Sequence, residues 1–345
     1  MNSARPRLGF AARLAIVGCA GLLVGGVAAI PFSGGASTKS ITVATSFPAT
    51  TAVMAVPTSV GTTTSVGPAT SVGPTASVGP TTVLATTIAA PTSTDDGAAP
   101  VTVSSVPQVD AKAYLVIDTA TGKQLAASNA DEQHPVGSII KLLNAYVVMQ
   151  AGDADKLVTV PPNVQIDPME SVIWLRPGER LARSVLLRAM LIVSANDAAR
   201  TLAVDVGGSQ DAFVVQMNSA AVTLGLTNTV AVNSVGLDAA GAHSSASDVA
   251  KLAITLMQDP TFRATVARPS AKLHGHTYPS TNDLLRTYRG ATGVKTGHTT
   301  DAGYCVVGSA MRNGRSLVVV VLGASSNKAR DASATALLDW GFAQP

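Results

Sequence analysis

The stretch "HPVGSIIKLLNAYVV" (residues 134–148) is apolar enough to be a core helix, yet it carries a hydroxyl and an amine. On a helix, positions i and i+3 are neighbours, so Ser138 and Lys141 would share one face. A serine hydroxyl is a poor nucleophile until a base takes its proton. Lysine can be that base only if burial or a nearby cation lowers its pKa. Because S-x-x-K is frequent by chance, the pair alone predicts only an apolar helix with two polar residues.

A second short motif, "SAN" (194–196), lies between two segments with helical spacing of apolar residues. A helix break there could aim Ser194 and Asn196 into a cleft. Serine and asparagine are also common helix N-caps, and this motif alone favours that structural role.

The third motif, "KTG" (295–297), lies on a predicted strand. Lys295 would be a second cation that keeps Lys141 neutral, and Thr296 could hydrogen-bond a carboxylate. Gly297 would let a substrate backbone approach the strand edge. An ordinary edge lysine before a glycine bulge would explain this motif equally well when it is taken alone.

The three motifs together are far more specific than any one of them. They follow in order along the chain, and they are predicted on a helix, at a helix break and on a strand. This is the motif set of penicillin-recognising serine enzymes.

The composition narrows the class of protein. The chain has 345 residues, of which 46% are apolar and 13% charged, so it can form a sizeable core and about two domains. The net charge is only +3, and the basic residues are scattered, so nucleic acid is not an expected partner. No Cys/His cluster has zinc spacing, and we expect His274 and His276 to be exposed in a loop. We expect no metal, no cofactor and, with Cys305 alone in the folded part, no disulfide framework.

The N-terminal third predicts export. Residues 1–35 combine a basic start with the apolar run "LAIVGCAGLLVGGVAAI" (14–30), which suits a retained membrane anchor, a cleaved signal or, less well, a lipoprotein through Cys19. Residues 36–108 repeat S-V-G-P among Thr and Ala, a composition typical of a disordered stalk. Residues 109–345 are then the folded, catalytic domain, and it would work outside the cytoplasm.

Within that domain, apolar spacing predicts a strand hairpin over 113–128 and helices in the opening stretch, on both sides of "SAN", and over 211–225 and 246–259. Ser245 or Ser247 is the expected N-cap of the last of these. Three strands and a closing helix follow, and Asn313-Gly314 predicts a type I′ hairpin. The order predicts an α+β fold, an antiparallel sheet covered by helices.

The segments "LRPGERLARSVLLRAMLIVSANDAARTLA", "HSSASDVAKLA" and "GVKTGHTTDAGYCVVGSAMRNGRSLVVVVLGA" resemble the serine D-alanyl-D-alanine carboxypeptidases. These are the low-molecular-mass penicillin-binding proteins of the peptidase S11 type. The resemblance covers nearly all of 109–343. It implies a β-lactamase/transpeptidase-like fold with a helical subdomain, peptidoglycan stem peptide as substrate and β-lactams as covalent inhibitors.

The resemblance also implies a role for each motif residue. Ser138 would be the acylated nucleophile and Lys141 its base, while Ser194 would relay a proton to the leaving amine. Asn196 would bind the substrate backbone, and Lys295, Thr296 and Arg330 would hold the terminal carboxylate. The backbone N–H groups of Ser138 and His298 would form an oxyanion hole.

The sequence departs from the family pattern at Val136, Gly137 and Ile140, where Pro, Ala and Thr are usual. We expect activity to survive with altered helix packing. Three alternatives stay open: a DD-endopeptidase acting on cross-links, a class A-like β-lactamase with Glu170 as its deacylating base, and an inactive wall-binding scaffold.

Overall fold

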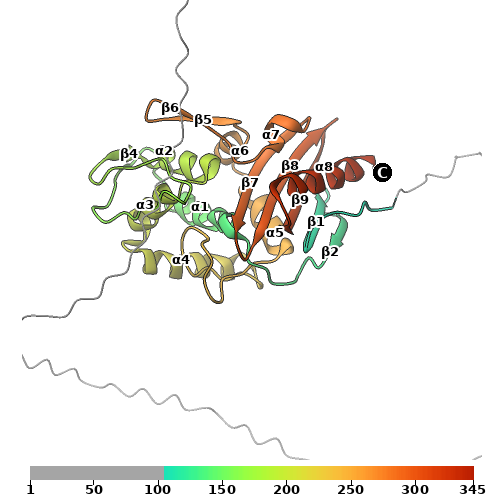
Figure 1. Ribbon diagram of the computed structural model, residues 1–345, viewed down its shortest axis with the longest axis horizontal. Helices are drawn as coiled ribbons and strands as arrows, with labels where there is room; N and C mark the ends of the chain where they lie inside the picture. Colours follow the sequence, from blue (N-terminus) through green and yellow to red (C-terminus); the bar gives the residue numbers. More distant parts are fainter. Residues whose placement is uncertain (1–104) are drawn as a thin grey trace, which may run out of the picture. The chain divides into compact units, whose positions relative to one another are not determined.

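The computed structural model describes residues 105–345 (Figure 1). The predicted signal or anchor (1–35) and nearly all of the predicted stalk (36–108) lie outside the described residues. None of the helices within 105–345 combines the length and the apolar character needed to cross a membrane.

A five-stranded antiparallel sheet forms the centre of the described fold, in the order β2-β1-β9-β8-β7. Its strands are β1 (Ala113–Asp118), β2 (Gln124–Ser128), β7 (Ala291–Thr299), β8 (Gly303–Arg312) and β9 (Arg315–Ala324). All five are predicted by the sequence.

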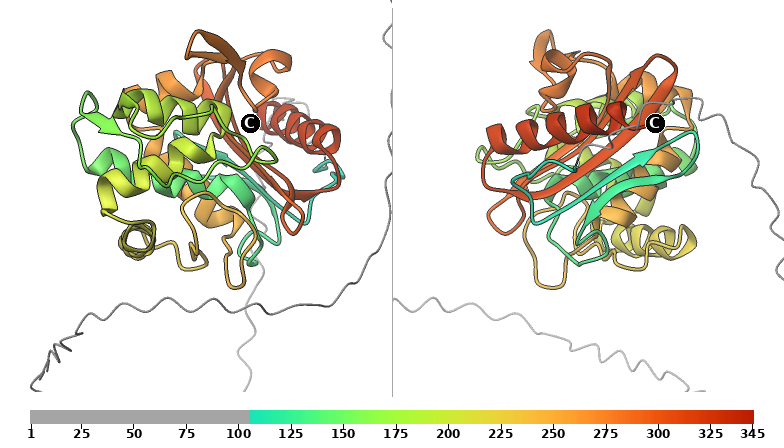
Figure 2. Two further views of the ribbon diagram at one scale, coloured as in Figure 1. Left: turned by 60° about the vertical axis from the view of Figure 1, so that its left-hand side comes forward. Right: turned by 90° about the vertical axis from the view of Figure 1, so that its right-hand side faces the viewer.

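Both faces of this sheet are covered by helices, so the central strands are apolar on both sides. In β9, Val318 and Val320 face one hydrophobic cluster and Val319 and Val321 face another. Helix α8 (Asn327–Ala343) packs on the second face, and Figure 2 shows it on the opposite side of the sheet from the helical region. The α+β class is therefore confirmed.

The turn between β8 and β9 follows the sequence prediction. Asn313 and Gly314 have φ angles of 51° and 79°, the two positive values that a type I′ turn requires. Ser245 is the N-cap of α5, since its hydroxyl accepts a hydrogen bond from the backbone N–H of Asp248.

The opening stretch begins as a 3-10 turn, η1 (Gly137–Ile140), and continues as α1 (Lys141–Gln150). The other predicted helices are confirmed, with a short π-helical turn, η2, just before "SAN". They are α2 (Arg183–Arg188), η2 (Ala189–Val193), α3 (Asn196–Gly207), α4 (Gln210–Thr223) and α5 (Ala246–Leu256).

Several short elements are not predicted by the sequence. They are the hairpin of β3 (Leu157–Thr159) and β4 (Arg180–Ala182), the hairpin of β5 (Ser270–Leu273) and β6 (His276–Pro279), and helices α6 (Pro260–Val266) and α7 (Leu284–Thr287). His274 and His276 are exposed, as expected, but they lie at the β5–β6 turn rather than in an irregular loop.

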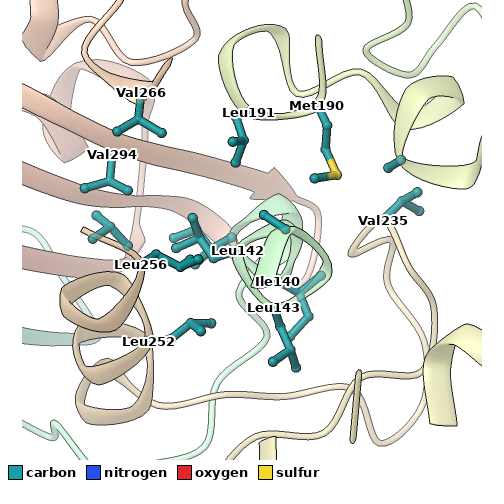
Figure 3. Close-up of a cluster of buried hydrophobic side chains, with 14 of the residues drawn as sticks. Ile140, Leu142, Leu143, Met190, Leu191, Val235, Leu252, Leu256, Val266 and Val294 are labelled. Atoms are coloured by element: carbon teal, nitrogen blue, oxygen red, sulfur yellow. The ribbon is translucent and has the colours of Figure 1, made fainter. Parts of the chain in front are cut away.

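The apolar residues of the opening stretch are core residues. Leu142 and Leu143 of α1 are completely buried, and Figure 3 shows them among side chains of η2, α5 and β7. Lys141 therefore begins a helix whose surroundings are hydrophobic, which is the setting that a neutral lysine requires.

Candidate active site

The first site pair is formed by Ser138 and Lys141, three residues apart across η1 and the first residue of α1. In a 3-10 turn, side chains at i and i+3 eclipse each other, and Lys141 Nζ lies 2.7 Å from Ser138 Oγ. Lys141 is completely buried, and its Nζ also donates a hydrogen bond to Val235 O at 2.6 Å. A neutral amine in this position gives one N–H to the carbonyl and keeps its lone pair for the serine hydroxyl.

The surroundings of Lys141 favour that neutral form. Burial lowers the pKa of Lys141 well below its ordinary value of 10.5, and the nearby cations Lys295 and Arg200 lower it further. The prediction that apolar surroundings and Lys295 depress this pKa agrees with the structure.

A loop from Asn233 to Leu237 places the carbonyl that Lys141 contacts. Asn233 Oδ1 accepts hydrogen bonds from the backbone N–H groups of Val235, Gly236 and Leu237 at 3.2, 2.7 and 3.2 Å. A Cβ on Gly236 would lie 2.2 Å from Gly137 O, so the loop packs directly on the nucleophile turn. None of the three motifs points to this loop, although an asparagine three residues before a glycine is a recognised turn signal.

The second pair is Ser194 and Lys295. Ser194 follows η2 and has a φ of 65°, an uncommon left-handed conformation that breaks the helix before α3. Its Oγ accepts a hydrogen bond from Lys295 Nζ at 2.9 Å, and the same Nζ donates to Thr296 O at 2.8 Å. Burial, and then the charge of Arg330, lower the pKa of Lys295 to about 7.

Asn196 is held by an ion pair that the sequence analysis did not identify. Arg200 donates to both carboxylate oxygens of Glu170, at 2.7 and 2.9 Å, and Asn196 Nδ2 donates to Glu170 Oε2 at 2.7 Å. A carboxylate only accepts, so the amide nitrogen of Asn196 must face Glu170. Asn196 Oδ1 is buried without a hydrogen-bond partner, and it is therefore free to accept one from a ligand.

The same ion pair bears on the proposed β-lactamase role of Glu170. Although burial raises the pKa of Glu170, hydrogen bonds from Arg200 and Asn196 bring it below its usual value. A carboxylate engaged in this way is a weakened general base, which disfavours the class A-like alternative.

Thr296 and Gly297 lie where β7 passes the nucleophile turn. Thr296 Oγ1 donates to Thr281 Oγ1 at 2.7 Å. A Cβ on Gly297 would lie 2.4 Å from Val136 O and 3.1 Å from Ser138 N. Glycine is therefore needed here for the close approach of the protein's own chain, a reason different from the substrate approach predicted by the sequence.

His298 and Arg330 complete the set of predicted residues. The ring of His298 stacks on Tyr304, with 4.0 Å between ring centroids, while its backbone nitrogen faces the turn at Gly137. Arg330, in the first turn of α8, is buried and pairs with Asp331 at 2.7 Å.

A cavity of about 500 Å³ brings these groups together. The two lysines lie beside it, each within hydrogen-bond distance of one of its serines. Within residues 105–345, no three His, Cys, Asp or Glu side chains gather as a set of metal ligands. The predicted residues that line the cavity are Ser138, Ser194, Asn196, Thr296, Gly297, His298 and Arg330.

A nucleophile, a buried amine with a lowered pKa and a set of cations around one cleft suit acyl transfer to a carboxylate-bearing substrate. Comparison with known proteins points the same way. The family model for peptidase S11, described as D-alanyl-D-alanine carboxypeptidase, matches residues 100–326.

Two relatives illustrate the match. D-alanyl-D-alanine carboxypeptidase DacC of Escherichia coli is 39% identical over 248 residues, which cover 68% of this chain and 62% of the relative. D-alanyl-D-alanine carboxypeptidase DacB2 of Mycobacterium tuberculosis is 37% identical over 254 residues, with 69% and 84% covered. The chain thus spans less than two thirds of the length of the Escherichia coli relative.

Solved structures share the fold. Penicillin-binding protein 6B of Escherichia coli superposes with a TM-score of 0.66 at 35% identity, covering 70% of this chain and 80% of that one. The Streptomyces K15 DD-transpeptidase gives a TM-score of 0.66 at 30% identity, covering 70% and 100%. These structures confirm the predicted β-lactamase/transpeptidase-like architecture, and with the sequence matches they show that the chain belongs to the D-alanyl-D-alanine carboxypeptidase family, peptidase S11.

Proposed function

We propose that the protein is a serine-type D-Ala-D-Ala carboxypeptidase that removes the terminal D-alanine from peptidoglycan stem pentapeptides. The observation that carries the proposal is the completely buried amine of Lys141, 2.7 Å from the Ser138 hydroxyl at the substrate cavity. A buried lysine with a depressed pKa is a base that can activate a serine.

Acylation begins at Ser138. Lys141 takes the hydroxyl proton, and Ser138 Oγ attacks the carbonyl carbon of the penultimate D-alanine. The backbone N–H groups of Ser138 and His298 hold the oxyanion that forms. The close packing of Gly297 on the nucleophile turn supports this pairing, because it brings β7 and the turn to within contact distance.

Release of the terminal D-alanine uses the second pair. Ser194 relays the proton that Lys141 took from Ser138 to the leaving amine as the peptide bond breaks. The carboxylate of that D-alanine is bound by Lys295, Thr296 and Arg330, and its negative charge favours the charged form of Lys295. Water then attacks the ester carbonyl, the tetrapeptide leaves and Ser138 Oγ regains its proton.

The remaining parts of the peptide lie along β7 and the "SAN" turn. Asn196 Oδ1, free of any partner in the described residues, accepts a hydrogen bond from a backbone N–H of the substrate. β-Lactams, which present a strained amide beside a carboxylate, acylate Ser138 by the same route.

The setting of the enzyme is also part of the proposal. Residues 1–35 attach the chain to the membrane or direct its secretion, and residues 36–108 hold the catalytic domain away from the bilayer. The basic start, the apolar run and the low-complexity repeats of the sequence support an extracytoplasmic location.

The test is release of D-alanine from a stem pentapeptide by the purified protein, with Ser138→Ala as the matched control. We expect the wild type to release one D-alanine per pentapeptide, and the control to release none and to take no label from fluorescent penicillin. Labelling of the Ser138→Ala variant, or cleavage of cross-linked dimers without release of D-alanine from the pentapeptide, would overturn the proposal.

A further inference from the structure

A second cavity, of about 530 Å³, lies between the segment 173–179 and the β5–β6 hairpin, and the proposed mechanism uses none of its residues. The hairpin stands out from the rest of the fold in Figures 1 and 2. His274 joins the two walls, since its Nε2 lies 2.7 Å from Glu179 Oε1 and its Nδ1 lies 3.3 Å from Ile173 O. The cavity therefore has fixed walls and no assigned ligand.

Two chain segments contribute residues to both this cavity and the substrate cleft. Glu170 and Ser171 line the cleft, and Trp174, a few residues on, lines the second cavity. On the other wall, Pro279 lines the cleft and its neighbour Tyr278 lines the second cavity. Neighbouring stretches of the same two chain segments therefore line the two cavities.

One of these two segments leads to the part of the cleft that we assign to the leaving group. Thr281, which follows the shared wall, is hydrogen-bonded to Thr296, the residue that we place at the substrate carboxylate. A monomeric stem ends at that carboxylate. An occupant beyond it would be a neighbouring part of the wall polymer, not the same stem peptide.

The lining suits a sugar ring. Trp174 is 54% exposed, although large apolar side chains are usually buried, and its φ of 61° is costly for a bulky residue. The rings of His276 and Tyr278 lie edge to face with 6.4 Å between centroids. Arg176 and Glu179 add hydrogen-bonding groups to the same cavity. A pyranose presents an apolar face of C–H groups and a rim of hydroxyls, which aromatic faces flanked by such polar groups complement.

We propose that this cavity binds a hexosamine ring of a peptidoglycan glycan strand that neighbours the strand carrying the scissile stem. The subsite favours pentapeptides within the polymer over soluble pentapeptides. The inference rests on the proposed function for its choice of polymer, but its binding test does not depend on turnover.

The binding test uses tryptophan emission. The chain has two tryptophans, Trp174 and Trp340, so Trp340→Phe leaves Trp174 as the only tryptophan. Titration of this full-length variant with chitotetraose should give a saturable change in emission. Trp174→Phe, which keeps Trp340, is the matched control and should give none. Absence of a saturable change in the first variant, or an equal change with cellotetraose, which lacks the acetamido groups, overturns the hexosamine assignment.

The activity test compares the activities on two substrates as a ratio. Its result is therefore independent of the absolute activity, which tests the proposed function. D-Alanine release is measured from a soluble pentapeptide and from pentapeptide-rich peptidoglycan sacculi. We expect Trp174→Ala to lower the ratio of sacculus to pentapeptide activity about five- to tenfold, the value of one lost ring contact. Val222→Ala removes another exposed apolar side chain, on α4, and should leave the ratio unchanged.

The outcomes are distinguishable. An unchanged ratio in Trp174→Ala, or an equal ratio loss in Val222→Ala, overturns the subsite. A wild-type protein that releases no D-alanine from either substrate overturns the proposed function, while the chitotetraose titration still decides whether the subsite binds a glycan.

Discussion

Two serine–lysine pairs face the same cleft, and their surroundings give them different chemistry. Lys141 Nζ is 2.7 Å from Ser138 Oγ, Lys295 Nζ is 2.9 Å from Ser194 Oγ, and both lysines are completely buried. Burial and two neighbouring cations lower the pKa of Lys141 well below its ordinary value, while Lys295, beside Arg330, keeps a pKa of about 7. The same two residue types thus become a base in one pair and a titratable cation in the other.

The largest effect is expected when the first lysine is removed. Lys141→Met fills the buried space without an amine, so Ser138 loses its base and acylation should slow by about 10³-fold or more. The measurement is the rate constant for acylation by fluorescent penicillin. Lys295→Met is the matched variant in the second pair, and an equal or larger loss of acylation there would break the distinction between the two lysines.

The second prediction concerns pH. Protonation of Lys141 removes the base, so activity falls as the pH falls through its depressed pKa. Lys295 is a cation below its pKa of about 7 and loses its charge above it, so kcat/KM for a carboxylate-bearing substrate should decline as the pH rises through about 7.

The variant that checks this assignment is Lys295→Arg, which keeps its charge because a guanidinium does not deprotonate in this range. Its basic limb should move to higher pH, even if its maximal rate is lower. A basic limb at the same pH in the variant and the wild type would assign the limb to another group.

The third prediction concerns the loop that supplies the backbone hydrogen-bond partner of Lys141. Asn233 positions the loop whose Val235 carbonyl accepts a hydrogen bond from Lys141. Asn233→Ala should lower kcat about tenfold with little change in KM, because the amine is misaligned while the substrate contacts remain. Asn233→Asp keeps the acceptor oxygen and should recover part of the loss. Equal kcat in the two variants would indicate that Asn233 supports only folding of the loop.

The smallest effect is expected at Glu170, which orients Asn196. Glu170→Gln can donate as well as accept, so the amide of Asn196 is no longer held in one orientation, and KM should rise about threefold to tenfold. Penicillin hydrolysis by the wild type and the variant should be equally slow. Fast hydrolysis that disappears in Glu170→Gln would instead support the β-lactamase alternative.

Much of the fold could be predicted because its signals are local. Asn313-Gly314 fixes a turn, and the apolar strand β9 is buried on both faces. The three motifs contain the residues of both serine–lysine pairs. What the sequence did not predict depends on contacts between distant segments without periodicity, such as Arg200 with Glu170 or Val235 with Lys141. Strand β6 is mostly exposed, and β5 alternates over only four residues, so the hairpin carries a weak periodic signal.

The proposed mechanism depends on Lys141 being a neutral amine at the pH where the enzyme works. It is tested most directly by an NMR titration of protein with ¹³C-labelled lysine, in which Lys141→Met assigns the Lys141 Cε signal. We expect this signal to titrate well below the ordinary value of 10.5 and to report a neutral amine at neutral pH. A Lys141 signal that titrates near 10.5, with the amine charged at neutral pH, would contradict it.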